Sequence, residues 1–296
     1  MRGEYEDKDQ GPEEESASPR KRTFPKKKFG QHFLTDKNLL ARIVRASETN
    51  EGDRVLEVGP GPGALTGALL NAGALVTAVE IDRELIAGLK ARFSGLPAFE
   101  LIQGDALKVS FLELSNKYGV KLKAVSNLPY NISGPIIFKF IKERAAFTRL
   151  VLMLQKEVAA RLAAGPGTKD YGALSVLAQL WCDVKVEFNV SRHLFKPPPK
   201  VDSSVVSFNI LDAPRVTVAD EGVFTRVVKS AFGLRRKTLL NALKTLPAGK
   251  EEILAALDAA GIDPRRRGET LSLEEFGLLT DAFLRLKTCV SQQGMQ

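Results

Sequence analysis

The chain contains few of the residues on which disulfides and metal sites depend. Among its 296 residues there are only two cysteines, Cys182 and Cys289, and two histidines. The cysteines lack CxxC spacing and the histidines are not clustered, so the sequence predicts neither a disulfide framework nor a bound metal. We interpret both cysteines as reduced, structural residues.

Long apolar runs are also absent. The longest, such as LVLML around Met153, are far shorter than the roughly 20 residues that span a bilayer, so no membrane segment is predicted. The first fifteen residues hold seven acids, which argues against a secretory signal or an organelle transit peptide. We therefore expect a cytoplasmic protein of bacterial type. It is expected to be a monomer, because no extra apolar helix face or heptad is evident.

Positive charge is abundant and unevenly distributed. The formal net charge is +8, which favours an anionic partner, nucleic acid first and a membrane surface second. Residues 16–30 hold six Lys or Arg and no acid. Such a run is equally compatible with a solvated tail and with nucleic-acid contact. Residues 1–25 are polar and charge-blocked, which predicts a disordered charged tail.

The remaining chain alternates between helical and strand-like patterns. This alternation predicts an α/β fold with a Rossmann-like, doubly wound parallel sheet, and residues 183–191 and 201–211 predict an antiparallel edge. Strand signals stop after Leu211. Helical patterns near 220–232, 236–245, 250–260 and 272–286 then predict a small all-helical domain. The expected domains are therefore 26–211, which binds the cofactor, and 212–296, which is helical.

A glycine-rich segment marks the expected cofactor site. VLEVGPGPGALT places Gly59, Gly61 and Gly63 directly after a strand and before a helix. Glycine lets the backbone approach a ligand closely, and the helix N-terminus offers free N–H groups. Glu80 follows at the end of the next strand, where a carboxylate can accept hydrogen bonds from ribose hydroxyls. An ordinary strand-to-helix turn is the alternative, and NAD would satisfy the same pattern.

Asp105, in QGDA after the third strand, is a candidate acceptor for an adenine amine, although a helix or turn cap explains it equally well. The tetrapeptide Asn127-Leu128-Pro129-Tyr130 after the fourth strand favours methyl transfer over NAD chemistry. The Asn127 side-chain oxygen and the Leu128 carbonyl can accept both hydrogens of an adenine amine and so direct its lone pair at a methyl group. Pro129 stiffens the turn, and Tyr130 offers an aromatic face to an unstacked base.

The segment HLFKPPPKVDS contributes one further candidate. Its prolines stiffen the loop, and Phe195 could present a second aromatic face to the base. Core packing explains Phe195 nearly as well.

With these residues in place, the chain closely resembles the KsgA family, the dimethyladenosine transferases of small-subunit ribosomal RNA. The resemblance runs from about Lys26 to Leu286 and includes KKKFGQHFL, LEVGPGPGALT, VEID, QGDAL, SNLPYNIS, LQKEVAARL, YGALSVLAQ, FKPPPKVDSSVV and RRKTLLNAL. It implies S-adenosylmethionine as the cofactor. It also implies two methyl transfers to each of two adjacent adenines near the 3′ end of the small-subunit RNA, within an immature 30S particle.

The resemblance also implies site residues. His32 and Leu34 would close over the methionine end of the cofactor, and Gly59, Glu80, Asp105 and Asn127 would complete the site. His32 departs from the asparagine common at that place but keeps a hydrogen-bonding side chain. Basic residues of the helical domain are candidates for phosphate contacts, with solvated helix faces as the alternative: Arg235, Arg236, Lys237 and the run Arg265–Arg267.

Two related functions compete with this prediction. One is the large-subunit RNA adenine methyltransferase group that confers macrolide resistance, which shares the glycine loop and an IPY or LPY motif. YGALSVLAQ and KPPPKVDS favour the small-subunit enzymes. The other is a noncatalytic assembly or transcription factor on the same fold, against which the intact Glu80, Asp105, Asn127 and Tyr130 argue.

Overall fold

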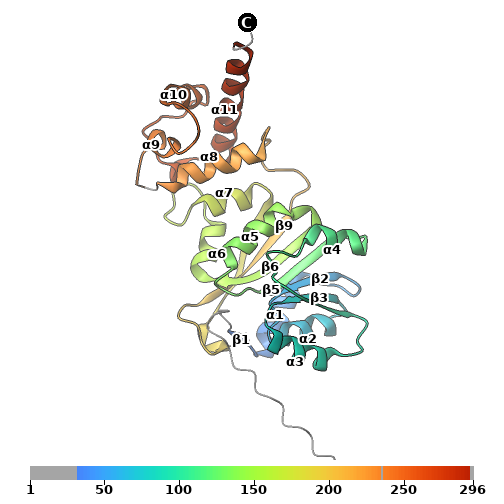
Figure 1. Cartoon of the computed structure of the whole chain (residues 1–296). Coiled ribbons are helices and arrows are strands. Elements are labelled where there is room, and N and C mark those ends of the chain that lie inside the picture. Colours follow the sequence, from blue (N-terminus) through green and yellow to red (C-terminus); the bar gives the residue numbers. More distant parts are fainter. Residues whose placement is uncertain (1–31, 235, 294–296) are drawn as a thin grey trace, which may run out of the picture.

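The protein consists of a mixed α/β region and a helical region (Figure 1). The computed structural model describes residues 32–234 and 236–293, with side chains described up to Leu286. The predicted tail over 1–25, the basic run over 16–30, Arg235 and the side chain of Cys289 lie outside the described residues.

A seven-stranded sheet in the order β4-β3-β2-β5-β6-β9-β7 forms the centre of the α/β region. Strands β2 to β6 are parallel, and β9 and β7 are antiparallel to their neighbours, as the sequence predicts. The strands are β2 (Arg54–Val58), β3 (Leu75–Glu80), β4 (Phe99–Gln103), β5 (Leu122–Asn127), β6 (Phe147–Gln155), β7 (Cys182–Val190) and β9 (Ser203–Ile210).

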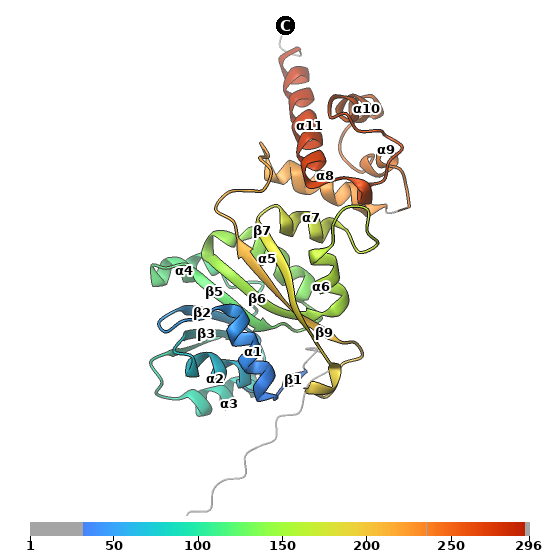
Figure 2. The ribbon, with the colours of Figure 1, turned by 180° about the vertical axis from the view of Figure 1, so that it is seen from behind.

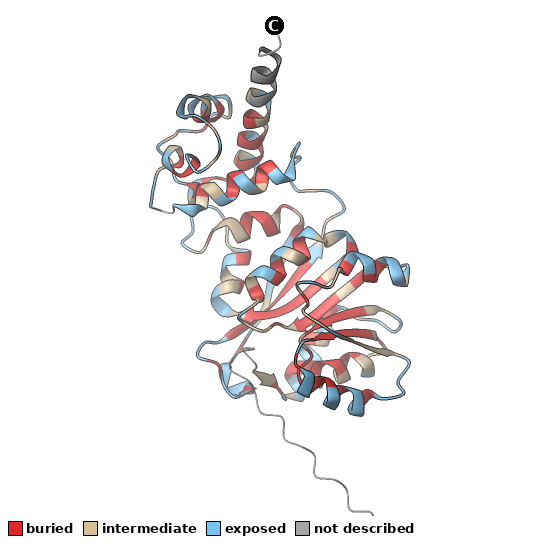
Figure 3. Cartoon of the chain, in the orientation of Figure 1, coloured by how far each residue is buried: buried red, intermediate tan, exposed pale blue. Residues whose placement is uncertain are grey.

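Helices cover both faces of this sheet, so its central strands are buried on both sides (Figure 3). Along β6, Leu150, Leu152 and Leu154 join one apolar cluster, whereas Val151 and Met153 join another. Alternate side chains of β6 point to opposite faces of the sheet, and both faces are buried. The sequence of β6 is therefore a continuous apolar run. The first cluster packs against α4 (Phe111–Tyr118), α5 (Ser133–Lys142) and α6 (Lys156–Ala163), and the second against α1 (Lys37–Ser47) and α2 (Ala64–Asn71) (Figure 2).

The strand order reverses between β2 and β5. The chain moves outward from β2 through β3 to β4, linked by α2 and α3 (Arg83–Phe93), and then returns to place β5 on the other side of β2. In open parallel sheets such a reversal opens a crevice at the carboxyl ends of the strands. The glycine loop, Glu80, Asp105 and the Asn127–Tyr130 turn lie at that edge.

A short two-stranded sheet, β1 (Phe33–Leu34) with β8 (Phe195–Lys196), lies beside this edge. Both strands have only two residues, too few for a recognisable sequence pattern. The pairing brings the start of the described chain next to the HLFKPPPK segment. The flanking η3 turn spans Arg192–Leu194.

The helical region forms its own apolar cluster. It contains α8 (Glu221–Gly233), α9 (Leu239–Leu243), α10 (Lys250–Ala259), the short turn η4 (Gly268–Thr270) and α11 (Leu273–Gln293). A second short turn, η2 (Arg144–Ala146), lies between α5 and β6. Tyr171 and residues of α7 (Ala173–Gln179) belong to the same cluster. The helical core therefore begins before the predicted boundary at residue 212. Within the described part of the chain, we find no helix with both the length and the apolarity to cross a bilayer.

Candidate active site

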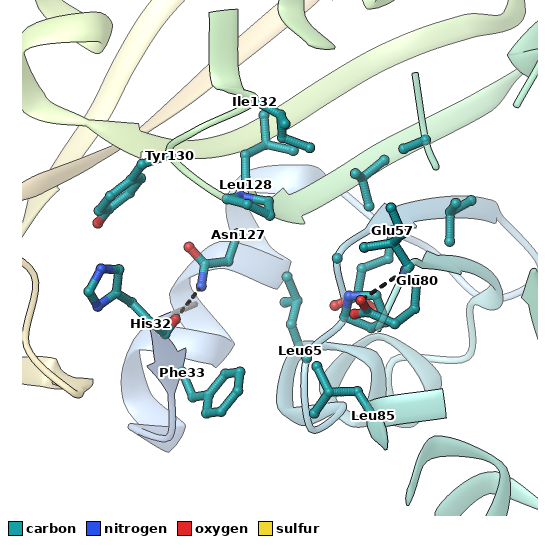
Figure 4. Close-up of a pocket in the computed structure, with 18 of the residues that line it drawn as sticks. His32, Phe33, Glu57, Leu65, Glu80, Leu85, Asn127, Leu128, Tyr130 and Ile132 are labelled. Atoms are coloured by element: carbon teal, nitrogen blue, oxygen red, sulfur yellow. Dashed lines mark hydrogen bonds between the residues drawn. The ribbon is translucent and has the colours of Figure 1, made fainter. Parts of the chain in front are cut away.

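A cavity of about 320 Å³ opens at the carboxyl ends of β2, β3 and β5, where the strand order reverses. This volume is within the range of small-molecule sites. Most of the predicted cofactor residues line it, namely His32, Leu34, Gly59, Gly61, Glu80, Asp105 and Asn127. The cavity wall also includes apolar side chains that the sequence analysis did not single out: Phe33, Leu65, Leu85 and Ile132 (Figure 4).

The backbone of the glycine loop runs along the cavity wall at Gly59 and Gly61. Gly59 and Gly61 have positive φ angles of 68° and 58°, which favour glycine. A Cβ atom at Gly59 would lie 3.2 Å from Cγ of Pro129, and one at Gly61 would lie 3.2 Å from Cδ1 of Phe33. Both glycines thus keep the loop close to the opposite wall while leaving its backbone accessible to a ligand.

Gly63 has a different role from the one predicted, because it does not line the cavity. Its φ is 82°, and an added Cβ would lie 2.6 Å from Cε2 of Phe93 and 2.9 Å from Cδ2 of Leu89. Gly63 therefore allows the start of α2 to pack closely against α3.

Two predicted carboxylates occupy the strand ends. Glu80 is buried, and its Oε1 accepts hydrogen bonds from the N–H groups of Ile81 and Asp82, both at 2.9 Å. Burial raises the pKa of Glu80, and hydrogen bonds from backbone N–H groups partly offset the rise. Asp105 lines the cavity while its Oδ1 accepts from the Leu107 N–H at 2.9 Å. It is therefore a turn cap and a cavity residue at once.

Glu57 is a cavity residue that the sequence analysis missed. It is only 1% exposed, and its Oε2 accepts from the Thr66 hydroxyl at 2.6 Å. Burial, helped by the nearby Glu80, raises the pKa of Glu57 to about 8, although the hydrogen bond from Thr66 acts in the opposite direction. An acid within the apolar run VLEV, directly before the glycine loop, was the signal that could have identified it.

Asn127 ends β5 and projects toward the cavity (Figure 4). Its Nδ2 donates to the backbone carbonyl of His32 at 3.1 Å. Because a carbonyl can only accept, this contact determines which end of the amide faces His32 and leaves Oδ1 for another donor. Within the described chain, no donor is bonded to the Leu128 carbonyl, so two acceptors lie next to each other in this turn.

Tyr130 and His32 form an aromatic pair at the side of the cavity. Their ring centroids are 5.4 Å apart with an interplanar angle of 32° (Figure 4). The Tyr130 hydroxyl shares a 2.6 Å hydrogen bond with Ser203, and Nδ1 of His32 lies 2.8 Å from the Pro197 carbonyl oxygen. The ring of His32 thus contacts Tyr130 and Pro197, and the backbone carbonyl of His32 orients the Asn127 amide.

Phe195 does not have the position that its predicted role requires. It is 1% exposed, belongs to the apolar cluster beneath β1 and does not line the cavity. Its side chain therefore packs in the core, the alternative that the sequence left open, and it offers no open face to a base.

Figure 1 shows α8 and α9 at the end of the molecule away from β1, whose Phe33 and Leu34 line the cavity. Arg236 and Lys237 are exposed in the turn between α8 and α9. Arg266 forms an ion pair with Glu275, and Arg265 pairs with Asp263 at 2.9 Å. Arg265 and Arg266 thus have acidic partners within the helical region.

The chain is similar over most of its length to known ribosomal RNA methyltransferases. The family model described as ribosomal RNA adenine dimethylase matches residues 23–282. A ribosomal RNA small subunit methyltransferase A from Geobacter metallireducens is 50% identical over 264 residues, covering 88% of this chain and 96% of that protein. The protein of the same name from Syntrophotalea carbinolica is 51% identical over 255 residues, covering 86% and 95%.

Two solved structures are similar over most of their length. A dimethyladenosine transferase from Plasmodium falciparum is 30% identical with a TM-score of 0.69, covering 86% of this chain and 98% of that chain. The 23S rRNA methyltransferase ErmE is 25% identical with a TM-score of 0.63, covering 85% and 99%.

Proposed function

The chain belongs to the ribosomal RNA adenine dimethylase family, and from this premise we infer that it dimethylates the exocyclic amines of two adjacent adenines near the 3′ end of small-subunit ribosomal RNA. Its methyl donor is S-adenosylmethionine. The observation that carries this function is the Asn127–Tyr130 turn, which lines a cavity beside a glycine loop and holds the Asn127 amide in one orientation.

The residues that line the cavity fit the parts of the cofactor. The Gly59 and Gly61 backbone would accommodate its methionine part, Glu80 its ribose hydroxyls and Asp105 its adenine amine. Leu34, Leu65 and Leu85 provide apolar surface. When bound, the cofactor supplies a methyl group on a positively charged sulfur.

The acceptor pair would prepare the amine for methylation. An adenine amine is a weak nucleophile because its lone pair is delocalised into the ring. Asn127 Oδ1 and the Leu128 carbonyl would accept its two hydrogens and favour a pyramidal nitrogen. The bound cofactor would supply the methyl group to this nitrogen, and the alkylated amine would release one proton to solvent. Positioning and fixed dipoles perform this step without an ionised base.

Tyr130 would hold the base during the reaction. Its ring is fixed at one end by Ser203 and lies beside His32. Proteins commonly stack unpaired RNA bases on aromatic rings of this kind. Because Phe195 is buried, Tyr130 is the aromatic residue of the predicted site that we assign to stacking.

The large-subunit alternative is less well supported. The relatives named for the small subunit are about half identical to this chain, whereas ErmE is 25% identical. The noncatalytic alternative would leave the oriented Asn127 amide without a role.

Our proposal includes an immature 30S particle as the substrate, action in the cytoplasm and a monomeric enzyme. The charge of +8 supports an RNA partner. The test is transfer of labelled methyl groups from S-adenosylmethionine to small subunits that lack the modification, followed by mass spectrometry of the nucleosides. We expect dimethyladenosine in the small-subunit RNA. RNA binding without transfer would instead favour an assembly factor, and transfer to large-subunit RNA would favour the macrolide-resistance group.

A further inference from the structure

Residues 192–202, which we call the rim segment, border the candidate active site. The Pro197 carbonyl contacts the His32 ring, and the segment ends next to Ser203, which holds the Tyr130 hydroxyl. Within it, β8 pairs with β1, whose Phe33 lines the cavity. The rim segment therefore lies where RNA on either side of an inserted adenine would pass.

Several contacts hold the rim segment in one conformation. Phe195 and Pro199 are buried. Arg192 donates from Nη1 to the Lys200 carbonyl at 3.1 Å and from its backbone N–H to Oδ1 of Asp202 at 3.1 Å. Three consecutive prolines, at positions 197–199, also restrict the φ angles of the backbone. The segment is thus a stiff support for its exposed side chains.

Lys196 and Lys200 flank these prolines, and both are exposed. Among the ion pairs and side-chain hydrogen bonds of the described chain, none involves the ammonium group of either lysine. The one acid of the rim segment, Asp202, is bonded to the Arg192 N–H. Two uncompensated positive charges are therefore held on a rigid support at the edge of the cavity.

We propose that Lys196 and Lys200 form a phosphate clamp that binds the RNA backbone on either side of the adenine in the cavity. This inference rests on the proposed function, because that function supplies an RNA substrate. Lysine binds phosphate as a point charge and carries no sequence information. A rigid support lowers the ordering cost of such contacts. The clamp acts on RNA binding and leaves orientation of the amine to Asn127 and Leu128.

The test compares the double variant Lys196→Gln/Lys200→Gln with the wild type. Binding of a fluorescent single-stranded RNA with two adjacent adenines is measured by anisotropy over a range of salt concentrations. For single strands, the slope of log K against log salt is negative, and each lost phosphate contact makes it shallower by about 0.7. We therefore expect the slope to become shallower by about 1.4 and the affinity at 0.1 M salt to fall by roughly 10–30-fold.

Two further variants and one binding measurement serve as controls. Lys90→Gln removes an exposed lysine on α3, outside the rim segment, and is expected to keep the wild-type slope. Lys196→Arg/Lys200→Arg is expected to restore it. Binding of S-adenosylmethionine, measured by calorimetry, is expected to be unchanged in the double glutamine variant, which shows that the site is intact. In transfer assays, KM for RNA is expected to rise while kcat changes little.

A wild-type slope in the double glutamine variant would overturn the clamp, as would a wild-type protein that does not bind the RNA. The proposed function has a separate test. A wild type that binds RNA with the predicted lysine-dependent slope but transfers no methyl groups would support the clamp and overturn the function. If the wild type transfers methyl groups but the double glutamine variant keeps the wild-type slope, the proposed function would be supported and the clamp overturned.

Discussion

The side-chain amide of Asn127 donates to the backbone carbonyl of His32 at 3.1 Å, joining residues 95 positions apart. The contact fixes the rotation of the amide about its last bond. It therefore directs Oδ1 away from His32, and the N-terminal segment contributes to the acceptor geometry of the NLPY turn through its backbone.

Replacing Asn127 by Ala should abolish most methyl transfer while cofactor binding stays close to wild type. Loss of one preorganised hydrogen-bonding group in an active site typically costs about 10²–10³ in kcat. Single-turnover transfer and calorimetric binding of S-adenosylmethionine would separate the two effects. Asn116→Ala, on an exposed position of α4, is the matched control. Unchanged turnover in Asn127→Ala would disprove the acceptor role.

Glu57 should make folding stability depend on pH. Burial raises its pKa from 4.5 to about 8, so the folded protein keeps a proton that the unfolded chain loses above pH 4.5. The stability from this group is complete below that pH and is lost as pH rises through about 8. Glu57→Gln should therefore gain stability relative to wild type between pH 5 and pH 9, as measured by urea unfolding. Parallel pH curves for the two proteins would contradict this, and exposed Glu51→Gln should be neutral.

Gly63→Ala should destabilise the fold more than Gly119→Ala. Both glycines have positive φ, so each substitution costs about 1–2 kcal/mol of backbone strain. At Gly119 nothing lies within 4 Å of an added Cβ, whereas at Gly63 the atom would meet Phe93 and Leu89. Overpacking adds about 1–3 kcal/mol. Chemical denaturation of both variants measures the difference, and equal losses would show that α2 and α3 separate easily.

Trp181 reports on the contact between the two regions. Arg144 lies 3.6 Å from the centroid of the Trp181 ring and pairs with Glu221, the first residue of α8, at 2.7 Å. The Trp181 Nε1 also donates to Glu221 at 3.2 Å. Because the chain has one tryptophan, its fluorescence reads this contact alone.

Arg144→Ala should shift Trp181 emission to longer wavelength and cost about 1–2 kcal/mol, because it removes both a cation–π contact and an ion pair. Emission spectra and urea unfolding test both effects. Arg161→Ala, which removes a surface pair with Glu157, should cost less than about 0.5 kcal/mol and leave the emission unchanged. An unshifted spectrum for Arg144→Ala would show that water already reaches the ring.

Local sequence patterns predicted the main architecture well. The alternation of helical and strand-like segments gave the parallel strands, the antiparallel edge formed by β9 and β7 and the four C-terminal helices. The alternation did not predict where the core of the helical region begins. The reason is that α7 is too short for a strong pattern and joins the helical cluster only through tertiary packing. The η turns and the two-residue strands β1 and β8 also have no pattern of their own.

The sequence by itself determined which residues reach the cavity wherever a motif residue ends a strand of the sheet or closely follows it. Gly59, Glu80, Asp105 and Asn127 are examples, because parallel strands deliver their carboxyl ends to one edge. Only the tertiary structure decided which way a side chain points where its position depends on contact with a segment far away in the sequence. Pairing of β1 with β8 buries Phe195, exposes Lys196 and sets His32 against Asn127. Such directions depend on register between segments more than 150 residues apart, which no local periodicity encodes.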